Sequence, residues 1–228
     1  MNKIFKYSLV LLIACFACSE DDTNNTNRYV PKPVNLDIPE VFENRILPAV
    51  IPANNPLTEE GIALGKKLFF DKKLSANNSQ SCATCHAPQK AFTNNLQFSI
   101  GIDQIEGTRN SMPLFNLAWN YDDKFFWDGR ELSLEHQVFD PITNPIEMHN
   151  TLDNVVHYLQ QDPNYPTLFE HAFGTSTIDS VLVSKAIAQF ERTIISANSK
   201  FDRYLLGEAT LTPQEQEGFN VFMDENRG

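Results

Sequence analysis

Residues 81–86 read Ser-Cys-Ala-Thr-Cys-His, and they are the most specific motif in the 228-residue chain. Two cysteines three positions apart, followed at once by a histidine, have the spacing that attaches a c-type haem. The thiols of Cys82 and Cys85 can bond the two vinyl groups of one porphyrin, which leaves His86 beside the iron as an axial ligand. The stretch therefore predicts a covalent haem c held by Cys82, Cys85 and His86.

Two other uses of these cysteines have weaker support. A structural zinc site needs four ligands, usually from two such pairs, and the remaining cysteines, Cys15 and Cys18, stand near the start of the chain. A thioredoxin-like redox pair would lie in a β-α-β unit, and the sequence shows little of the alternation typical of strands. The small number of cysteines also excludes a disulfide-rich scaffold.

The first residues are typical of an export signal. Two lysines precede an apolar run that is too short to span a membrane. The run ends in small residues and cysteine, so we predict a lipoprotein signal peptide over residues 1–17, with lipidation of Cys18 or, alternatively, Cys15. Residues 18–35 are polar, as in a flexible tether. These features predict a protein of the periplasm or cell envelope that meets the membrane only through a lipid anchor.

The chain carries a net charge of −11 at pH 7. This charge argues against nucleic-acid binding, because phosphate recognition needs clustered lysine and arginine. It suits docking of a basic protein partner, and it equally suits plain solubility. Phenylalanine is abundant, with 17 residues, and large aromatic side chains can form either an ordinary core or the walls of an apolar cofactor pocket.

Apolar residues recur at helical spacing in several segments, so we predict an all-α fold. Thr58 and Thr151 have the character of N-cap residues. Helices are also expected over residues 165–173 and 177–195. A helix from Thr212 to about residue 223 should begin with a capping box and a proline in its first turn.

Residues 74–150 are rich in proline, asparagine and glycine, and they are expected to form long loops with short helices. A boundary is expected near residues 174–176. We therefore predict a cytochrome c-like haem domain over residues 36–175 and the start of a second such domain over residues 176–228. Two or three helices can hardly bury a core alone, so we expect the second domain to be truncated.

The residues around the haem motif carry a wider resemblance, from about residue 57 to the end of the chain. Its main elements are Leu64-Gly65-Lys66-Lys67-Leu68-Phe69-Phe70-Asp71, Ser81 to His86, Arg109-Asn110-Ser111-Met112-Pro113, Phe125-Phe126-Trp127-Asp128-Gly129-Arg130, Leu134-Glu135-His136-Gln137, Pro145-Ile146-Glu147-Met148 and Phe201-Asp202-Arg203-Tyr204-Leu205. In this ordered set the chain resembles the bacterial di-haem cytochrome c peroxidases and their MauG-like relatives.

The resemblance implies two cytochrome c-like domains with one haem each, and a second Cys-x-x-Cys-His motif beyond Gly228. It implies a cytochrome c peroxidase that reduces hydrogen peroxide at the first haem, with electrons from a small cytochrome c or cupredoxin. Two alternatives stay open: a MauG-like oxidase acting on a protein or small molecule, and a non-enzymatic c-type electron carrier. Because members of this family often form dimers of identical chains, the resemblance also implies a homodimer.

The resemblance also assigns roles to single residues. Glu147 matches the catalytic glutamate, whose carboxylate moves a proton between the two oxygens of peroxide. Gln137 matches an amide that helps to hold peroxide and water, and Trp127 matches the tryptophan that relays electrons between the haems. Asn110 matches a residue near an interdomain calcium ion, which makes calcium a second expected cofactor.

One loop departs from the family pattern. Residues 99–102 align with a segment that often ends in a histidine, which blocks the peroxidatic iron in the oxidised resting state, and here that position is Ile102. Isoleucine cannot bind iron, so we expect the oxidised first haem to need no prior reduction. An electron carrier would instead need a strong sixth ligand, for which Met112, Met148 and Met223 are the candidates.

Overall fold

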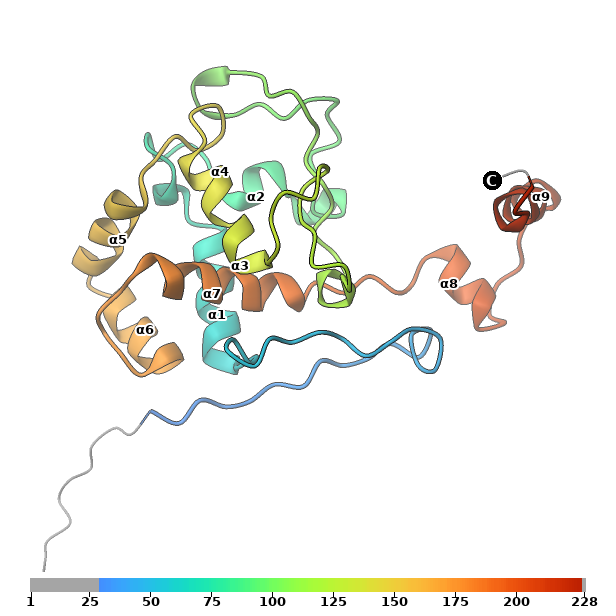
Figure 1. The fold of residues 1–228 in the computed structure, drawn as a ribbon, viewed down its shortest axis with the longest axis horizontal. Helices are drawn as coiled ribbons and strands as arrows, with labels where there is room; N and C mark the ends of the chain where they lie inside the picture. Colours follow the sequence, from blue (N-terminus) through green and yellow to red (C-terminus); the bar gives the residue numbers. More distant parts are fainter. Residues whose placement is uncertain (1–28, 227–228) are drawn as a thin grey trace, which may run out of the picture.

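Two helices from distant parts of the sequence pack on each other at the centre of the fold (Figure 1). They are α1 (Glu59–Phe69) and α7 (Ser180–Arg192). In the computed structural model, which describes residues 29–226, α6 (Tyr165–Phe173) contacts both of them. The predicted signal peptide, residues 1–17, lies outside the described residues, as does the first part of the predicted tether.

Short helices and loops fill most of the chain between α1 and α7. The remaining elements are η1 (Lys72–Leu74), α2 (Cys82–Cys85), η2 (Pro88–Lys90), η3 (Ile102–Gln104), η4 (Leu117–Trp119), α3 (Leu134–Gln137), α4 (Phe139–Thr143), α5 (Leu152–Gln161), α8 (Lys200–Leu205) and α9 (Pro213–Met223). Between residues 29 and 226 there is no β-strand, only isolated bridges such as the one between Ala87 and Thr93. The predicted all-α fold with long loops is confirmed.

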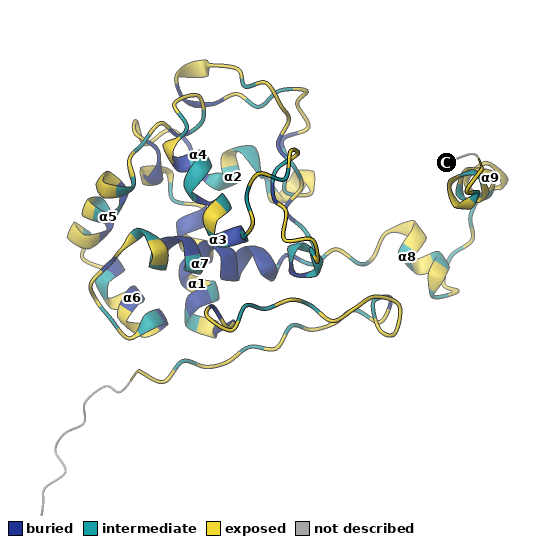
Figure 2. Ribbon diagram, viewed as in Figure 1, coloured by how far each residue is buried: buried dark blue, intermediate teal, exposed yellow. Residues whose placement is uncertain are grey.

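The main apolar core lies between α1, α5, α6 and α7. The apolar side chains that follow one face of α7 and the turn after it, here called the α7 stripe, are Val183, Ile187, Phe190 and Ile194, and all four are buried in this core. The ring of Phe190 packs edge to face on that of Phe69, with 5.2 Å between the ring centroids. Figure 2 shows the result: α7 is largely buried and α1 is buried on one face, whereas α8 and α9 are exposed along most of their surface.

A glycine sets how closely α1 and α7 approach. A Cβ atom added at Gly65 would stand 1.8 Å from the carbonyl oxygen of Ala186. That separation is far below van der Waals contact, so any larger residue must push the backbones apart.

Gly65→Ala is therefore expected to lower the free energy of unfolding by about 1–3 kcal/mol or more, as overpacking a tight core does. The matched control is Gly218→Ala in α9, where an added Cβ would meet nothing within 4 Å and alanine should be neutral or stabilising by up to about 1 kcal/mol. Denaturant titration of the haem-loaded proteins, followed by circular dichroism, measures both. Equal stability of the two variants would contradict the close contact.

A buried chain of hydrogen bonds ties the N-terminal segment to α7 and α3. The backbone N–H of Thr58 donates to Oε1 of Gln189 over 3.1 Å, and Nε2 of Gln189 donates to Oδ1 of Asn55 over 2.9 Å. Nδ2 of Asn55 donates to Oε1 of Glu135 over 2.6 Å. The carboxylate of Glu135 also accepts two hydrogen bonds from the Arg192 guanidinium, of 2.6 and 3.0 Å. The last turn of α7 thereby holds α3, which is only one turn long.

The predicted helix starts at three threonines are confirmed. Thr58, Thr151 and Thr212 each accept a hydrogen bond from a backbone N–H of the first helical turn. The prediction of a helix over 177–195 is too long, because the side chain of Asp179 caps α7 and the helix ends at Arg192. Among the described residues, no helix has the length and apolar character needed to cross a bilayer.

The packed unit does not end near residue 175, where we predict a domain boundary. Ile178 and all of the α7 stripe belong to the same core cluster as α1, because an amphipathic helix must bury its apolar face and α1 provides the partner. The chain leaves this unit after Ser196, whose backbone exchanges hydrogen bonds with the Asn116 side chain. Beyond it, α8 and α9 stand apart (Figure 1) and pack on each other through Phe201 and Phe219.

Candidate functional site

Helix α2 places both motif cysteines on a single turn. The backbone N–H of Ser81 donates to the hydroxyl of Thr84 over 3.0 Å, and the N–H of His86 donates to the carbonyl of Cys82 over 2.9 Å. These bonds are local, so the motif sequence alone shapes the turn. Burial raises the pKa of the Cys82 and Cys85 thiols, which keeps both sulfurs neutral.

The ring of His86 is oriented by the carbonyl oxygen of Phe92, which lies 2.9 Å from Nδ1. A carbonyl can only accept, so Nδ1 carries the proton and Nε2 keeps its lone pair. Burial lowers the pKa of His86, which favours the neutral imidazole that binds metals. Phe92 has φ of 54°, a left-handed backbone that is strained for a bulky residue and that delivers its carbonyl to the imidazole. A histidine that binds a metal through one ring nitrogen usually donates its other ring N–H to such a carbonyl, so this contact suits His86 to the predicted role of axial ligand.

A cavity of about 380 Å³ opens beside Cys85 and His86. Its volume falls within the ~300–1,000 Å³ typical of cofactor and ligand pockets. Leu114, Phe125 and Trp127 contribute apolar surface to the lining. The residues present therefore fit a porphyrin, with thiols for its vinyl edge, a neutral imidazole for its iron and apolar walls for its faces.

Two of the predicted catalytic residues, Glu147 and Gln137, line this same cavity. Glu147 lies in the turn after α4, where its Oε1 accepts a hydrogen bond of 2.8 Å from Nδ2 of Asn144. Burial raises the pKa of Glu147, and the hydrogen bond from Asn144 offsets part of that rise. A raised pKa makes this half-buried carboxylate a stronger base than an ordinary glutamate, which suits it to take up a proton and then release it.

A smaller cavity of about 50 Å³ lies next to the motif, and Cys82, Gln137, Glu147 and Glu191 all line it. Glu191 is 3% exposed, and its Oε2 has no hydrogen-bond partner among the described residues. Side chains from α2, α3, α7 and the turn after α4 thus meet at one place, although they are far apart in the sequence.

The loop at residues 99–107 closes on the Glu147 turn. The N–H of Ile102 donates to the Glu147 carbonyl over 2.7 Å, and Ile102 is 2% exposed. A Cβ atom at Gly101 would stand 1.6 Å from the carbonyl oxygen of Ile146, so the contact requires glycine. Ile102 lines neither cavity, and its position serves as a support for Glu147.

Two further predicted residues lie on the rim of the larger cavity. Trp127 is 57% exposed, and its Nε1 donates to the backbone carbonyl of Asn110 over 3.4 Å. Asn110 is exposed and lines the cavity. The part of the chain that the structure describes contains no group of three or more His, Cys, Asp or Glu side chains able to hold a metal ion. Calcium at Asn110 therefore stays a prediction.

A run of ion pairs follows the same rim. Arg109 pairs with Asp128 at 2.9 Å, and Arg130 pairs with Asp128 at 3.1 Å and with Asp140 at 3.0 Å. The Arg130 guanidinium also stacks 3.6 Å from the ring centre of Phe126. Both arginines line the cavity, so they supply the charged donors that suit haem propionates.

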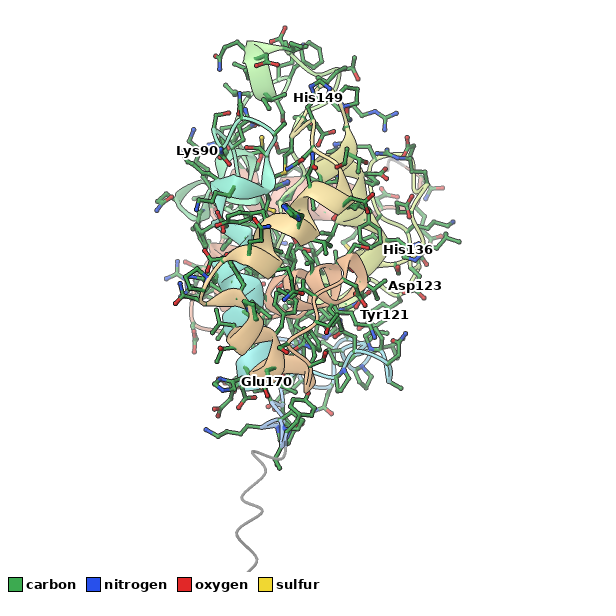
Figure 3. The ribbon with its side chains drawn as sticks, turned by 90° about the vertical axis from the view of Figure 1, so that its left-hand side faces the viewer. Lys90, Tyr121, Asp123, His136, His149 and Glu170 are labelled. Atoms are coloured by element: carbon green, nitrogen blue, oxygen red, sulfur yellow. The ribbon has the colours of Figure 1, made fainter. Side chains whose placement is uncertain are left out.

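The other four histidines are exposed and lie away from the site. They are His136, His149, His157 and His171, and none lines either cavity. Figure 3 shows His136 and His149 at the surface of the molecule. None of the four is therefore placed to take over the role of the family histidine whose position Ile102 occupies.

The three candidate methionines are placed differently. Met112 lines the larger cavity and Met148 the smaller one. Met223 is 62% exposed on α9. The structure therefore leaves Met112 and Met148, but not Met223, near the haem motif.

Three residues of the site have no role in the sequence-based prediction: Phe92, Asn144 and Glu191. Asn144 carried a signal, because an Asn-Pro pair marks a turn three residues before Glu147. Phe92 and Glu191 carried none, since a carbonyl contact and a buried charge on an amphipathic helix are visible only in the folded chain.

Comparisons with known proteins agree with this geometry. The family model described as di-haem cytochrome c peroxidase matches residues 59–210. The methylamine utilization protein MauG of Methylorubrum extorquens is 43% identical over 173 residues, which cover 75% of this chain and 48% of that protein. Cytochrome c551 peroxidase of Nitrosomonas europaea is 37% identical over 175 residues, which cover 76% of this chain and 51% of that protein.

Solved structures give the same result. The crystal structure of a MauG-like protein associated with microbial copper homeostasis matches with a TM-score of 0.74 and 33% identity, covering 84% of this chain and 55% of that one. The chain spans about half the length of the curated relatives it matches. The family model covers the haem motif, the Glu147 turn and the core helices α1 and α7. The chain therefore belongs to the di-haem cytochrome c peroxidase family.

Proposed function

We propose that this chain supplies the peroxide-reducing haem domain of a cytochrome c peroxidase. The observation that carries the proposal is the Glu147 carboxyl on the wall of the cavity that Cys85 and His86 also line. Reduction of hydrogen peroxide to two waters consumes two electrons and two protons. A protein that performs it needs an iron site and a group that moves protons beside it, and this cavity provides residues for both.

When bound, haem c supplies the iron at which peroxide binds and its O–O bond is cleaved. Cys82 and Cys85 would hold the porphyrin, and His86 would bind the iron through Nε2. Glu147 takes the proton from the inner oxygen of peroxide and returns it to the outer oxygen, which then leaves as water. The amide of Gln137, on the same wall, holds peroxide and product water by hydrogen bonds.

The proposal extends to the electron path and the location. Electrons would come from a small cytochrome c or cupredoxin through a second haem domain, with Trp127 at the cavity rim as the relay. The net charge of −11 favours a basic donor. We further propose export to the periplasm or cell envelope with a lipid anchor at Cys18 or Cys15, calcium near Asn110, and a homodimer.

The direct test uses the oxidised, haem-loaded, full-length protein mixed rapidly with hydrogen peroxide. Because Ile102 offers no ligand, we expect a prompt change of the haem absorption spectrum without prior reduction, followed by turnover when reduced cytochrome c is added. A low-spin, bis-histidine spectrum of the oxidised first haem would refute the Ile102 argument. A haem that is inert to peroxide in both redox states would refute the proposed function.

A second candidate function is MauG-like oxidation of a protein or small molecule. The observation that favours it is the 43% identity to a methylamine utilization protein MauG. Rapid turnover of peroxide with a reduced small cytochrome supports the peroxidase, whereas peroxide consumption that depends on an added organic substrate supports the oxidase. An electron carrier, with Met112 or Met148 as sixth ligand, would show no spectral response to peroxide.

Gly101→Ala tests the support of the Glu147 turn. The added Cβ would clash with the Ile146 carbonyl and displace Glu147, and misplacing a catalytic group by about 1 Å can cost ~10²-fold in rate. We expect a loss of that order in the rate with peroxide, while the haem content measured by pyridine haemochrome stays unchanged. Asp103→Asn, a change at an exposed residue of the same loop, is the control. An unaltered rate in Gly101→Ala would show that the loop does not position Glu147.

A further inference from the structure

Glu191 is a buried carboxyl that the proposed reaction does not use. It is the penultimate residue of α7 and is 3% exposed. Its Oε2 is buried without a hydrogen-bond partner among residues 29–226. An unpaired buried acceptor costs about 1–3 kcal/mol, and such groups in folded proteins are normally satisfied by protein or by ordered water.

The charged groups around Glu191 do not supply that partner. Both oxygens of Glu135 accept from the Arg192 guanidinium, at 2.6 and 3.0 Å, so Arg192 is directed at another carboxylate. Cys82 shares the cavity wall with Glu191, but its sulfur has no proton to donate once it forms a thioether. The other polar or titratable side chains on this wall are Gln80, Ser81, Cys85, His86, Gln137 and Glu147. Nδ1 of the neutral His86 ring donates to the Phe92 carbonyl and Nε2 of Gln80 donates to the Ile100 carbonyl, and the Cys85 sulfur, like that of Cys82, has no proton once it forms a thioether.

The cavity beside Glu191 has room for water. Its volume of about 50 Å³ exceeds the ~10–15 Å³ that one water molecule requires, and a buried water needs two to four polar partners. Glu191, Gln137 and Glu147 on its wall provide carboxyl and amide groups of the kind required.

We propose that Glu191 holds an internal water in this cavity, that hydrogen bonds through this water connect it to Gln137 and Glu147, and that Glu191 acts as a positioning residue and proton reserve for Glu147. The proposal rests on the proposed function, because it extends the path of the protons that peroxide reduction consumes. Once Glu147 has returned the peroxide proton, a proton would move from the Glu191 carboxyl to the water and from the water to the Glu147 carboxylate. Glu147 would pass this proton to the remaining oxygen of peroxide, which leaves as the second water, and so becomes a carboxylate again. Solvent then restores the proton to Glu191.

The protonation of Glu191 agrees with this role. Burial raises its pKa to about 8, with Arg192 lowering it and Glu135 raising it. The carboxyl therefore carries a proton at neutral pH and loses it in moderately alkaline solution. Glu147 lies on the same cavity wall, so it can accept the proton that Glu191 releases.

Glu191→Gln, in the haem-loaded full-length protein, separates this role from a packing role. The amide keeps the size and polarity of the side chain but cannot release a proton. The infrared band of a buried carboxylic acid, assigned as the band absent from Glu191→Gln, should be present in the wild type at pH 7 and should vanish as the pH rises past about 8. This measurement needs no turnover, so it stands even if the protein proves inert to peroxide.

The kinetic arm compares turnover with peroxide over pH 6–9. We expect Glu191→Gln to lower kcat by about 10–100-fold, as loss of a hydrogen-bonding group behind a site residue does, with little change in KM and without the alkaline fall of the wild type. Glu191→Asp, which keeps the carboxyl, should recover part of the rate. Glu170→Gln, a change on the exposed surface of α6 (Figure 3), should match the wild type. A wild-type pH profile in Glu191→Gln, or no carboxylic acid band assignable to Glu191, would overturn the proposal.

Discussion

Glu147→Gln is expected to slow the reaction of the oxidised, haem-loaded protein with hydrogen peroxide by about 10²–10⁴-fold, the usual contribution of a general acid–base group. The amide fills the same space and can still bond to Asn144, which donates to Oε1 of Glu147 over 2.8 Å. It cannot take the proton from the inner oxygen of peroxide. Stopped-flow spectroscopy at several peroxide concentrations measures the loss.

The raised pKa of Glu147 also predicts the direction in which the rate changes with pH. Burial raises the pKa of Glu147, so its carboxylate, the form that acts as base, is lost at a higher pH than for an ordinary glutamate. The wild-type rate should therefore fall as the pH falls through that raised value, and Glu147→Gln should not show this limb. Asp103→Asn removes an exposed carboxylate nearby and should leave the profile unchanged. A Glu147→Gln protein with wild-type rates would rule out this residue as the base.

Arg192→Met is expected to lower the free energy of unfolding by about 3–5 kcal/mol, the cost of leaving one partner of a buried ion pair uncompensated. The side chains of Arg192 and Glu135 are only 6% and 13% exposed and lie 2.6 Å apart. Methionine fills much of the space of the arginine stem but leaves the Glu135 carboxylate with only its neutral donor, Asn55. Denaturant titration at pH 7 measures the loss.

The same pair predicts how the loss changes with pH. Burial pushes the pKa of Glu135 upward, but hydrogen bonds from Arg192 and Asn55 outweigh it and lower the pKa overall. A depressed carboxyl pKa contributes stability above the pKa of the unfolded chain, and that contribution disappears as the pH falls through the folded value. The difference between Arg192→Met and the wild type should therefore shrink in acid. Arg203→Met, at an exposed position of α8, should cost little at any pH.

Adding Glu135→Gln to Arg192→Met tests the cause. If an unpaired charge is responsible, the double variant should recover part of the stability that Arg192→Met loses, because no buried carboxylate remains. A double variant that is less stable by the sum of both single losses would instead indicate that packing dominates.

Features that depend on neighbouring residues were predictable from the sequence. The spacing of Cys82, Cys85 and His86 predicts a porphyrin attachment within five residues, and the structure shows the single turn that brings these residues together. The N-caps at Thr58 and Thr151 are local as well, since a hydroxyl and a backbone N–H three positions later are brought together by the helix itself. Such bonds form whatever the rest of the chain does.

Features that depend on distant segments were not predictable in this way. Glu191 and Arg192 follow one another on α7, next to the apolar stripe, and a charged pair in such a place normally faces solvent. Their burial depends on α3, which packs on α7, and on the small cavity that Glu191 shares with Cys82, and no local pattern encodes either. The packing of α7 across the boundary expected near residue 175 escapes local patterns for the same reason, because its partner α1 lies more than a hundred residues earlier in the sequence.

Helix α7 makes buried contacts on two sides, and these contacts limit which substitutions its sequence can tolerate. One side packs on α1 around Gly65, and its last turn reaches the small cavity through Glu191 and anchors α3 through Arg192. In a saturation mutagenesis screen, tolerance should drop sharply along Ala186–Arg192 and stay high at Val181, which is 50% exposed. Substitutions within that stretch that change side-chain size should lower folding yield and peroxide tolerance of the host together, whereas Glu191→Gln, which keeps the size of the side chain, should lower peroxide tolerance alone.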